Sequence, residues 1–323
     1  MIDERSYVAG IDGGASKTIA LIADTNGRIL GSGKAGPSNY HNIGIGPASA
    51  AIESAVKEAK EKAGIREKPE IAVVALAAVD SERDLRVASQ FVRDTKVAET
   101  SIVVHDSVAA LYAATKGRMG IVVNSGTGSF AAGINSRGKY ARAGGWGYII
   151  GDEGSAYAIG LNAIKMAFRS FDGRGKNTSL ADLIKRRFRI RKLDDLVSQI
   201  YNNELTVEQI ASVAPLVIRT EHIDSISKAI LIDAGTQLGE QVCAVASRLK
   251  MTRQAFQVAA VGGNFRSGKC IMQALRSKIR ECCPKARVIH LHVEPALGSL
   301  SIALEAFSRK TANDSALRFR PVR

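Results

Sequence analysis

The fold of this chain is indicated by a segment near its N-terminus, Val8-Ala9-Gly10-Ile11-Asp12-Gly13-Gly14-Ala15-Ser16-Lys17-Thr18. Its first residues predict a short buried strand, and the glycines that follow predict a tight turn. A second strand is predicted over 18–23 and a third over 28–32. They are joined at Asn26-Gly27, a dipeptide typical of hairpin turns. The chain therefore opens with three short strands, and its first turn is rich in glycine.

The same pattern begins again at Gly120. Residues 120–124 predict a buried strand, and the turn Ser125-Gly126-Thr127-Gly128-Ser129 follows it, with further strands predicted at 130–135 and 139–143. Between the two copies, helical spacing at 47–63, 81–94 and 107–115 alternates with strands at 71–77 and 101–104. Two three-strand units that each contain a Gly/Ser/Thr turn indicate an internal duplication.

The rest of the chain completes an α/β pattern. After Gly151 the sequence becomes rich in predicted helices, before strands at 257–261 and 287–291 and helices at 267–282 and 296–308. We predict an α/β fold of two lobes with a helical insertion in the second lobe. The N-terminal lobe covers 1–117 and is completed by a C-terminal helix at about 296–310. The second lobe covers 118–295, and a basic tail follows at 311–323.

Composition favours a globular protein. The 323 residues are 46% hydrophobic and 24% charged, and no apolar run approaches the roughly 20 residues that span a bilayer. The first residues show no signal-peptide pattern, so we expect a cytoplasmic protein without a membrane partner. The four cysteines, Cys243, Cys270, Cys282 and Cys283, lack zinc spacing. We expect them to be reduced, partly buried thiols, because adjacent cysteines do not easily form a structural disulfide.

The net charge of +14 is concentrated in two stretches, 185–192 and 309–323. An excess of positive charge is compatible with binding to nucleic acid, with binding of anionic substrates, or with a role in solubility alone. No nucleic-acid motif accompanies either stretch, so nucleic acid is not an expected partner. We expect small molecules as ligands and a homodimer as the assembly.

Two glycine-rich turns follow strands at matching places of the duplicated unit. Glycines let the backbone approach an anion, and exposed N–H groups and small hydroxyls can hold phosphate oxygens. Each turn alone is equally consistent with a simple hairpin. As a pair they predict a polyphosphate site for ATP. The residues concerned are Gly13, Gly14, Ser16, Lys17, Thr18, Gly126, Thr127 and Gly128.

A third glycine turn needs a separate interpretation. The segment from Gly263 to Cys270 nearly matches the P-loop pattern G-x-x-x-x-G-K-S/T, but it has cysteine where a hydroxyl should ligate Mg²⁺. Few residues remain after it to build the rest of a P-loop sheet. We therefore interpret Gly262, Gly263 and Asn264 as a contact to the adenosine end of ATP.

Two aspartates lie at predicted strand ends, where open α/β sheets place ligands. Phosphoryl transfer to a hydroxyl needs a carboxylate near the attacking oxygen and a metal to neutralise phosphate charge. Asp106 is the candidate base, although a helix N-cap explains its position equally well. Asp12 is the candidate ligand for Mg²⁺, through water, because Mg²⁺ keeps several of its waters.

The segment 144–155 is the densest functional-looking stretch of the chain. It contains the only tryptophan, Trp146, between two glycines, and the acidic pair Asp152-Glu153. Sugars pack their apolar faces on aromatic rings and hydrogen-bond to carboxylates, so this segment predicts a sugar site. The alternative for Asp152 and Glu153 is N-capping of the helix predicted at 155–170.

These residues resemble the N-acetylglucosamine kinase branch of the actin-like ATPases, grouped with the BadF/BadG/BcrA/BcrD-type ATPases. The resemblance extends over about 8–307, and its most specific parts are 125–129 and 144–155. It implies two ribonuclease-H-like lobes with a cleft that closes on substrate. It implies ATP held by Ser16, Lys17 and Thr127, and Asp106 as the base. The sugar contacts that it implies are Asn39, Tyr40, Asp106, Ser129, Gly145, Trp146 and Asp152.

The predicted function is that of an ATP-dependent sugar kinase acting on N-acetylglucosamine, glucosamine or a hexose. One departure bears on the sugar: Phe130 follows Ser129 where animal N-acetylglucosamine kinases have asparagine. The alternative substrate is 2-keto-3-deoxygluconate. Two alternatives of other classes are a non-catalytic sugar sensor and an ATPase that activates a CoA-type dehydratase through an iron–sulfur cluster. The position of all four cysteines, at or beyond 243, argues against the activator.

Overall fold

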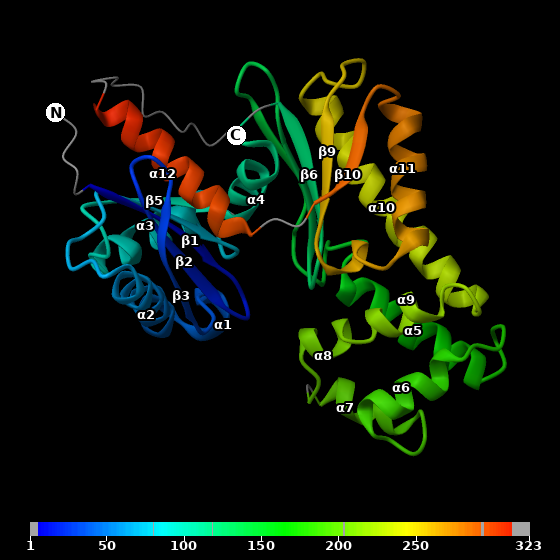
Figure 1. Cartoon of the computed structure of the whole chain (residues 1–323). Coiled ribbons are helices and arrows are strands. Elements are labelled where there is room, and N and C mark those ends of the chain that lie inside the picture. Colours follow the sequence, from blue (N-terminus) through cyan, green and yellow to red (C-terminus); the bar gives the residue numbers. More distant parts are fainter. Residues whose placement is uncertain (1–5, 80, 118, 203, 292–293, 312–323) are drawn as a thin grey trace. The chain divides into compact units, whose positions relative to one another are not determined.

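The computed structural model describes residues 6–79, 81–117, 119–202, 204–291 and 294–311 (Figure 1). These residues form two compact units. The first contains 6–79, 81–117 and 294–311, and the second contains 119–202 and 204–291. Apart from Thr311, the expected basic tail lies outside the described residues.

The first unit is built on a five-stranded mixed sheet. Strands β1 (Tyr7–Gly13), β2 (Thr18–Asp24) and β3 (Ile29–Ala35) form the predicted antiparallel meander. Strands β4 (Ile71–Leu76) and β5 (Thr100–His105) extend the sheet in parallel with β1, which gives the order β3-β2-β1-β4-β5. The predicted strands are confirmed, with ends that differ by a few residues.

Helices cover both faces of this sheet (Figure 1). Alternate residues of a strand point to opposite faces, so Ala9 and Ile11 of β1 pack with α2 (Ile45–Ala63) and α3 (Glu82–Asp94). Val8 of the same strand packs in a second core, with α4 (Asp106–Thr115) and α12 (Pro295–Thr311). The short helix α1 (Tyr40–Ile43) precedes α2.

The packing of α12 depends on two glycines. A Cβ added at Gly10 of β1 would overlap the backbone of Leu300 and Ala296, and one added at Gly298 would overlap the carbonyl of Ala109 in α4. The helix therefore lies closer to the strand and to its neighbouring helix than a larger residue would permit. In this way α12, the last helix that the structure describes, closes the core of the first unit.

The second unit repeats the same sheet. Strands β6 (Gly120–Ser125), β7 (Ser129–Ile134) and β8 (Tyr140–Gly144) form the meander, and β9 (Gln257–Val261) and β10 (Arg287–His290) continue in parallel with β6. The order β10-β9-β6-β7-β8 is that of the first sheet with β6 in the place of β1. The duplication inferred from the sequence pattern is therefore confirmed by topology.

Helices fill the rest of the second unit, which confirms the predicted helical insertion. Helix α5 (Ala156–Phe171), the long α10 (Ser225–Arg248) and α11 (Lys269–Cys282) pack in one core with the sheet. Among the described residues, four shorter helices lie between α5 and α10, and a 3-10 turn, η1 (Gly263–Phe265), precedes α11. The short helices are α6 (Leu180–Phe188), α7 (Asp195–Tyr201), α8 (Val207–Ala211) and α9 (Ala214–Thr220). No helix within the described residues combines the length and the apolar character needed to cross a membrane.

The cysteines differ from expectation. Cys243 of α10 and Cys282 of α11 form a disulfide, whereas Cys270 and Cys283 are free and buried. The prediction of four reduced thiols was wrong because it considered only the adjacent pair. The partner of Cys282 lies 39 residues away in sequence and is brought within bonding distance by the packing of two helices.

Candidate functional site

The carboxyl edge of the first sheet gathers acidic side chains. In the parallel register, Gly13 of β1 lies opposite Leu76 of β4, and Leu76 lies opposite His105 of β5. Asp12 precedes Gly13 and Asp106 follows His105, so the two aspartates end up on the same edge. Glu294, just before α12, also interacts with Asp12, and its carboxylate lies 4.0 Å from Nζ of Lys17.

These charges perturb Asp12. Burial raises the pKa of the Asp12 carboxyl to about 7, with further contributions from Asp106 and Glu294, and Lys17 opposes the shift only in part. Negative charge held close together in a desolvated place favours either a proton or a bound cation. Perturbation of this kind is characteristic of functional sites.

Stability should depend on pH through this group. The folded-state pKa of Asp12 exceeds its usual value, so the stability that this group contributes is fully present below about pH 4 and is lost as the pH rises to 7. We expect Asp12→Asn to remove this loss, so that in EDTA the variant is more stable than the wild type by roughly 4 kcal/mol at pH 8 and about equally stable near pH 4. Urea unfolding at several pH values measures the difference. The matched variant Asp94→Asn, on an exposed position of α3, should follow the wild-type curve.

Asp106 does not have the capping role that the sequence permitted. The N-cap of α4 is His105, whose Nδ1 accepts the backbone N–H of Ser107 at 3.0 Å, and Asp106 is the first helical residue. The Oδ1 of Asp106 lies 2.9 Å from the same Nδ1. A histidine ring takes the place usually filled by Ser, Thr, Asp or Asn, so the carboxylate of Asp106 is not needed to cap the helix.

The first glycine turn is held to the start of the 36–39 turn. The carbonyl of Gly14 accepts the backbone N–H of Ser38, and the hydroxyl of Thr18 donates to the carbonyl of Gly36 at 2.8 Å. Thr18 is fully buried, so its hydroxyl organises the turn, whereas Ser16 and Lys17 are exposed at its tip. The predicted phosphate and sugar segments of this unit are therefore neighbours.

The predicted sugar contacts of the first unit have structural partners of their own. The side chain of Asn39 accepts the backbone N–H of His41 at 3.1 Å and so caps α1. Tyr40 is buried against Phe91, and its hydroxyl lies 3.0 Å from a carboxylate oxygen of Asp84. Both residues thus fix the turn that follows β3.

The second glycine turn is bound to the segment before α5. The hydroxyl of Ser125 donates to the carbonyl of Gly154 at 2.6 Å, and the hydroxyl of Ser129 donates to the carbonyl of Glu153 at 2.7 Å. The carbonyl of Gly126 accepts the N–H of Ala156 at 2.7 Å. Ser125 and Ser129 are buried at the base of the turn, whereas Thr127 is exposed at its tip.

Asp152 supports this turn instead of capping α5. Its Oδ1 accepts the backbone N–H of Ser129 at 3.2 Å, and its φ of 60° is left-handed. A Cβ at Gly128 would lie only 3.1 Å from its carboxylate. The N-cap of α5 is Ser155, so the capping alternative is wrong for Asp152 and for Glu153. Left-handed backbone at a non-glycine residue beside a predicted ligand site is a feature of functional positions.

The 144–151 segment leaves apolar side chains in solvent. Trp146 is 55% exposed and Ile149 is 79% exposed. The guanidinium of Arg142 lies over the Trp146 ring, 4.7 Å from its centre. Gly145 lies against Phe130, the residue that departs from the animal pattern. An exposed ring held by a cation has the chemical character of a sugar platform.

The third glycine turn meets the second. Asn264 is buried, and its Nδ2 donates to the Ser125 hydroxyl at 2.9 Å. A Cβ at Gly262 would overlap the carbonyl of Ser125, and its φ of 110° also favours glycine. Gly263 stays exposed. The structure thus brings 125–129, 152–156 and 262–264 together within the second unit.

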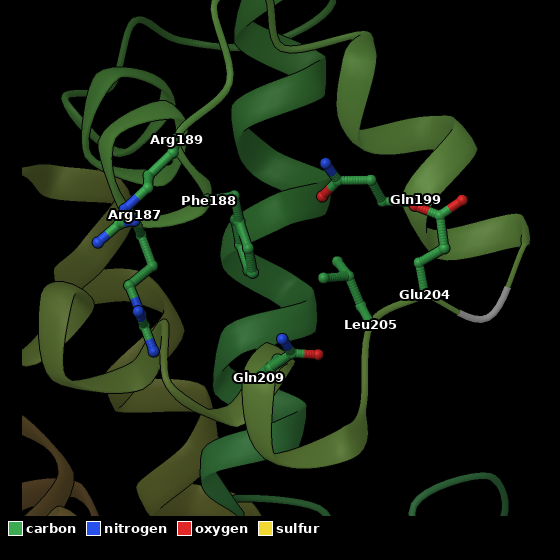
Figure 2. A pocket seen from close by; sticks show the side chains of 7 residues that line it. All are labelled: Arg187, Phe188, Arg189, Gln199, Glu204, Leu205 and Gln209. Atoms are coloured by element: carbon green, nitrogen blue, oxygen red, sulfur yellow. The ribbon is translucent and has the colours of Figure 1, made fainter.

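A separate cavity of about 300 Å³ lies among the short helices of the second unit (Figure 2). Phe188 stands between the arginine pair Arg187 and Arg189 on one side and Gln199 on the other. None of the predicted site residues lines it. Within the described part of the chain, no group of three or more His, Cys, Asp or Glu side chains is arranged to hold a metal ion.

Sequence reasoning missed three supporting residues. Glu294 faces Lys17 and Asp12, Gln241 of α10 donates to the carbonyl of Glu153 at 3.2 Å, and His105 caps α4. An acidic residue directly before Pro295 at a helix start, and a histidine directly before Asp106, were the available signals. Gln241 lies in the middle of a helix, where nothing local marks it.

The duplicated five-stranded sheets define the class of protein. The structure aligns with a ROK family glucokinase from Streptomyces griseus, solved with glucose and AMPPNP, at a TM-score of 0.56 and 17% identity, covering 92% of this chain and 98% of that one. It aligns better, at a TM-score of 0.75 and 26% identity, with a Chromobacterium violaceum protein proposed to be an N-acetylglucosamine kinase, covering 93% and 99%. The fold is therefore the two-lobed actin-like ATPase fold of sugar kinases.

Comparison with related sequences shows to which family of this class the chain belongs. The chain is 34% identical to the N-acetylmuramic acid/N-acetylglucosamine kinase of Clostridium acetobutylicum over 92% of this chain and 98% of the relative. It is 30% identical to the N-acetyl-D-glucosamine kinase of Dictyostelium discoideum over 94% and 99%. The model of the BadF/BadG/BcrA/BcrD ATPase family matches residues 9–303. The chain belongs to this family.

Proposed function

We propose that this chain, an ATP-dependent sugar kinase, transfers the γ-phosphate of ATP to a hydroxyl of N-acetylglucosamine or a closely related amino sugar. The observation that carries the proposal is the placement of Asp106 and Asp12 on one sheet edge, beside a glycine turn whose Ser16 and Lys17 are exposed. The names of the relatives support the choice of sugar.

Asp106 is the proposed base of the reaction. Its carboxylate accepts the proton of the sugar hydroxyl as the oxygen attacks the γ-phosphorus. The ring of His105 lies beside this carboxylate, with its Nδ1 2.9 Å from Oδ1 of Asp106. The backbone N–H groups of the glycine turns, with Ser16 and Thr127, bind the phosphate oxygens and stabilise the charge that develops on the transferring group.

Asp12 is the proposed contact for Mg²⁺, through water. A cation offsets the clustered charge of Asp12, Asp106 and Glu294, and a site with few direct protein ligands is typical of Mg²⁺. When bound with ATP, the ion supplies neutralisation of phosphate charge. Asp12 positions its water shell, and Lys17 adds a positive charge at the turn.

The proposed sugar contacts are Asn39, Tyr40 and Asp106 of the first unit and Ser129, Gly145, Trp146 and Asp152 of the second unit. Trp146 offers an aromatic face, and Asp152 and Ser129 lie at the adjacent turn. The adenosine end of ATP is assigned to Gly262, Gly263 and the backbone around Asn264. A homodimer and a cytoplasmic location stay predictions of the sequence, as does a cleft that closes on substrate.

The test is ADP release measured by a coupled assay, with N-acetylglucosamine, N-acetylmuramic acid, glucosamine, glucose, mannose and 2-keto-3-deoxygluconate as acceptors. We expect the highest kcat/KM with an N-acetylated amino sugar, and ADP release without sugar that is lower by about 100-fold or more, since the hydroxyl must be positioned for attack. Preference for 2-keto-3-deoxygluconate would show that the substrate is an acidic sugar and not an amino sugar. Sugar binding without ADP release would instead indicate a sensor.

A further inference from the structure

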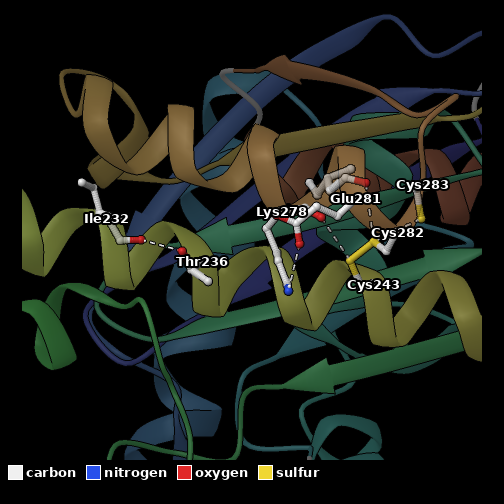
Figure 3. A network of polar contacts seen from close by, with 8 residues as sticks. Ile232, Thr236, Cys243, Lys278, Glu281, Cys282 and Cys283 are labelled. Carbon is white, nitrogen blue, oxygen red and sulfur yellow. Dashed lines mark hydrogen bonds and ion pairs between the residues drawn. A yellow bond between two sulfur atoms is a disulfide. The ribbon is translucent and has the colours of Figure 1, made fainter.

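The disulfide between α10 and α11 is the feature that the proposed function leaves unexplained (Figure 3). Cys243 lies in α10, and Cys282 is the last residue of α11, with a Cα–Cα distance of 6.0 Å. Both are half-buried, whereas the free thiols of Cys270 and Cys283 are buried. The bonded pair is therefore the more accessible to an external thiol.

The surroundings of the pair also accommodate its reduced form. The Sγ of Cys243 lies 3.7 Å from the carbonyl of Lys278, and the Sγ of Cys282 lies 3.5 Å from the carbonyl of Ile279. Two free thiols would thus each have a carbonyl acceptor nearby. Reduction leaves no buried donor without a partner, so both redox forms are compatible with the fold.

Cys283 does not compete for this bond. Its Sγ lies 3.6 Å from the Sγ of Cys282, but neighbouring Cα atoms are only about 3.8 Å apart, less than the roughly 4.4 Å that a normal disulfide spans. Burial also raises the pKa of the Cys283 thiol, which keeps it protonated and poorly nucleophilic. Exchange at Cys243–Cys282 therefore requires a thiol from outside the chain.

The two linked helices support the candidate site from two sides. Gln241, two residues before Cys243 in α10, donates to the carbonyl of Glu153, and Leu238 of the same helix packs against Gly154. Helix α11 begins just after the turn in which Asn264 contacts Ser125. The bond between α10 and α11 thus adds a covalent link between the helix that supports 152–155 and the helix that follows the support of 125–129.

We propose that Cys243–Cys282 is a redox modification site, at which thiol–disulfide exchange with a dithiol partner changes the order of the 144–155 segment. A thiolate of the partner attacks one sulfur, and the other leaves as a thiolate that takes up a proton. The second thiol of the partner then resolves the mixed disulfide. Two protein thiols and one partner disulfide result, and two electrons and two protons are transferred.

The experiment uses Trp146, the only tryptophan, as the reporter within 144–155. Dithiothreitol should expose two alkylatable thiols, assigned to Cys243 and Cys282 by mass spectrometry, and change the Trp146 emission. Oxidised glutathione should then remove these thiols and return the emission to its starting value. Cys243→Ser should fix the emission of the reduced form and abolish the response. Cys270→Ser, at a buried free thiol, is the matched control and should keep the response of the wild type.

Activity gives a second readout, which rests on the proposed function. We expect reduction to raise the KM for the sugar by about 3- to 10-fold and reoxidation to reverse the change. Four alkylatable thiols in the untreated, aerobically purified protein, or an unchanged Trp146 emission after complete reduction, would overturn the inference. If neither redox form phosphorylates any sugar, the proposed function fails, and the alkylation and emission data still decide the redox site.

Discussion

Asp106→Asn is expected to lower sugar-dependent turnover by about 1,000-fold, because the amide cannot accept the proton of the attacking hydroxyl and a positioned base contributes roughly 100- to 10,000-fold. The substitution preserves shape, and His105 continues to cap α4, so the fold should persist. Turnover is measured by ADP release at saturating sugar and ATP.

The Asp106→Asn experiment needs a binding control. ATP binding, measured by calorimetry, should stay within about threefold of the wild type, because the base acts on the sugar hydroxyl and makes no attractive contact with the nucleotide. The matched variant Asp233→Asn, at an exposed position of α10, should retain full turnover. If Asp106→Asn retained turnover within tenfold, the assignment of the base would be wrong.

Gly10→Ala is expected to destabilise the first unit by about 3 kcal/mol, at the upper end of typical overpacking costs. The new methyl group would overlap the backbone of Leu300 and Ala296 in α12, and a helix backbone cannot yield as a side chain can. Because α12 directly follows Glu294, we also expect its displacement to disturb the charge cluster around Asp12. Urea unfolding followed by circular dichroism measures the loss.

Gly46→Ala is the matched control for this substitution. Gly46 lies in the first turn of α2, and a Cβ added there meets no atom within 4 Å apart from those of its own chain neighbours. Alanine is the better helix former, but a Cβ before Pro47 disfavours helical backbone, so the control should stay within about 1 kcal/mol of the wild type. Equal stability of Gly10→Ala and Gly46→Ala would contradict the close approach of α12 to β1.

Several features of the site follow from local sequence. The glycine turns after β1 and β6, the hairpins and the positions of Asp12 and Asp106 at strand ends were all readable, because turn chemistry and period-two burial act over a few neighbouring residues. The duplicated meander was readable for the same reason, and it led to the correct fold.

The roles of individual side chains were harder to predict from the sequence. Asp106 and Asp152 both looked like helix caps, but His105 and Ser155 hold those positions. Spacing alone cannot distinguish neighbouring residues that are all able to cap. The choice depends on backbone angles, such as the left-handed φ of Asp152, and these are set by packing around the turn.

By itself, then, the sequence determined which segments become strands, helices and glycine turns, and that one three-strand unit occurs twice. Only the tertiary structure decided that Glu294 joins Asp12 and Asp106, that Gln241 supports the segment beside Asp152, and that Cys243 bonds to Cys282. The physical reason is range. Strand, helix and turn preferences act between near neighbours, whereas charge clusters, helix contacts and disulfides join residues that only the packed core brings together.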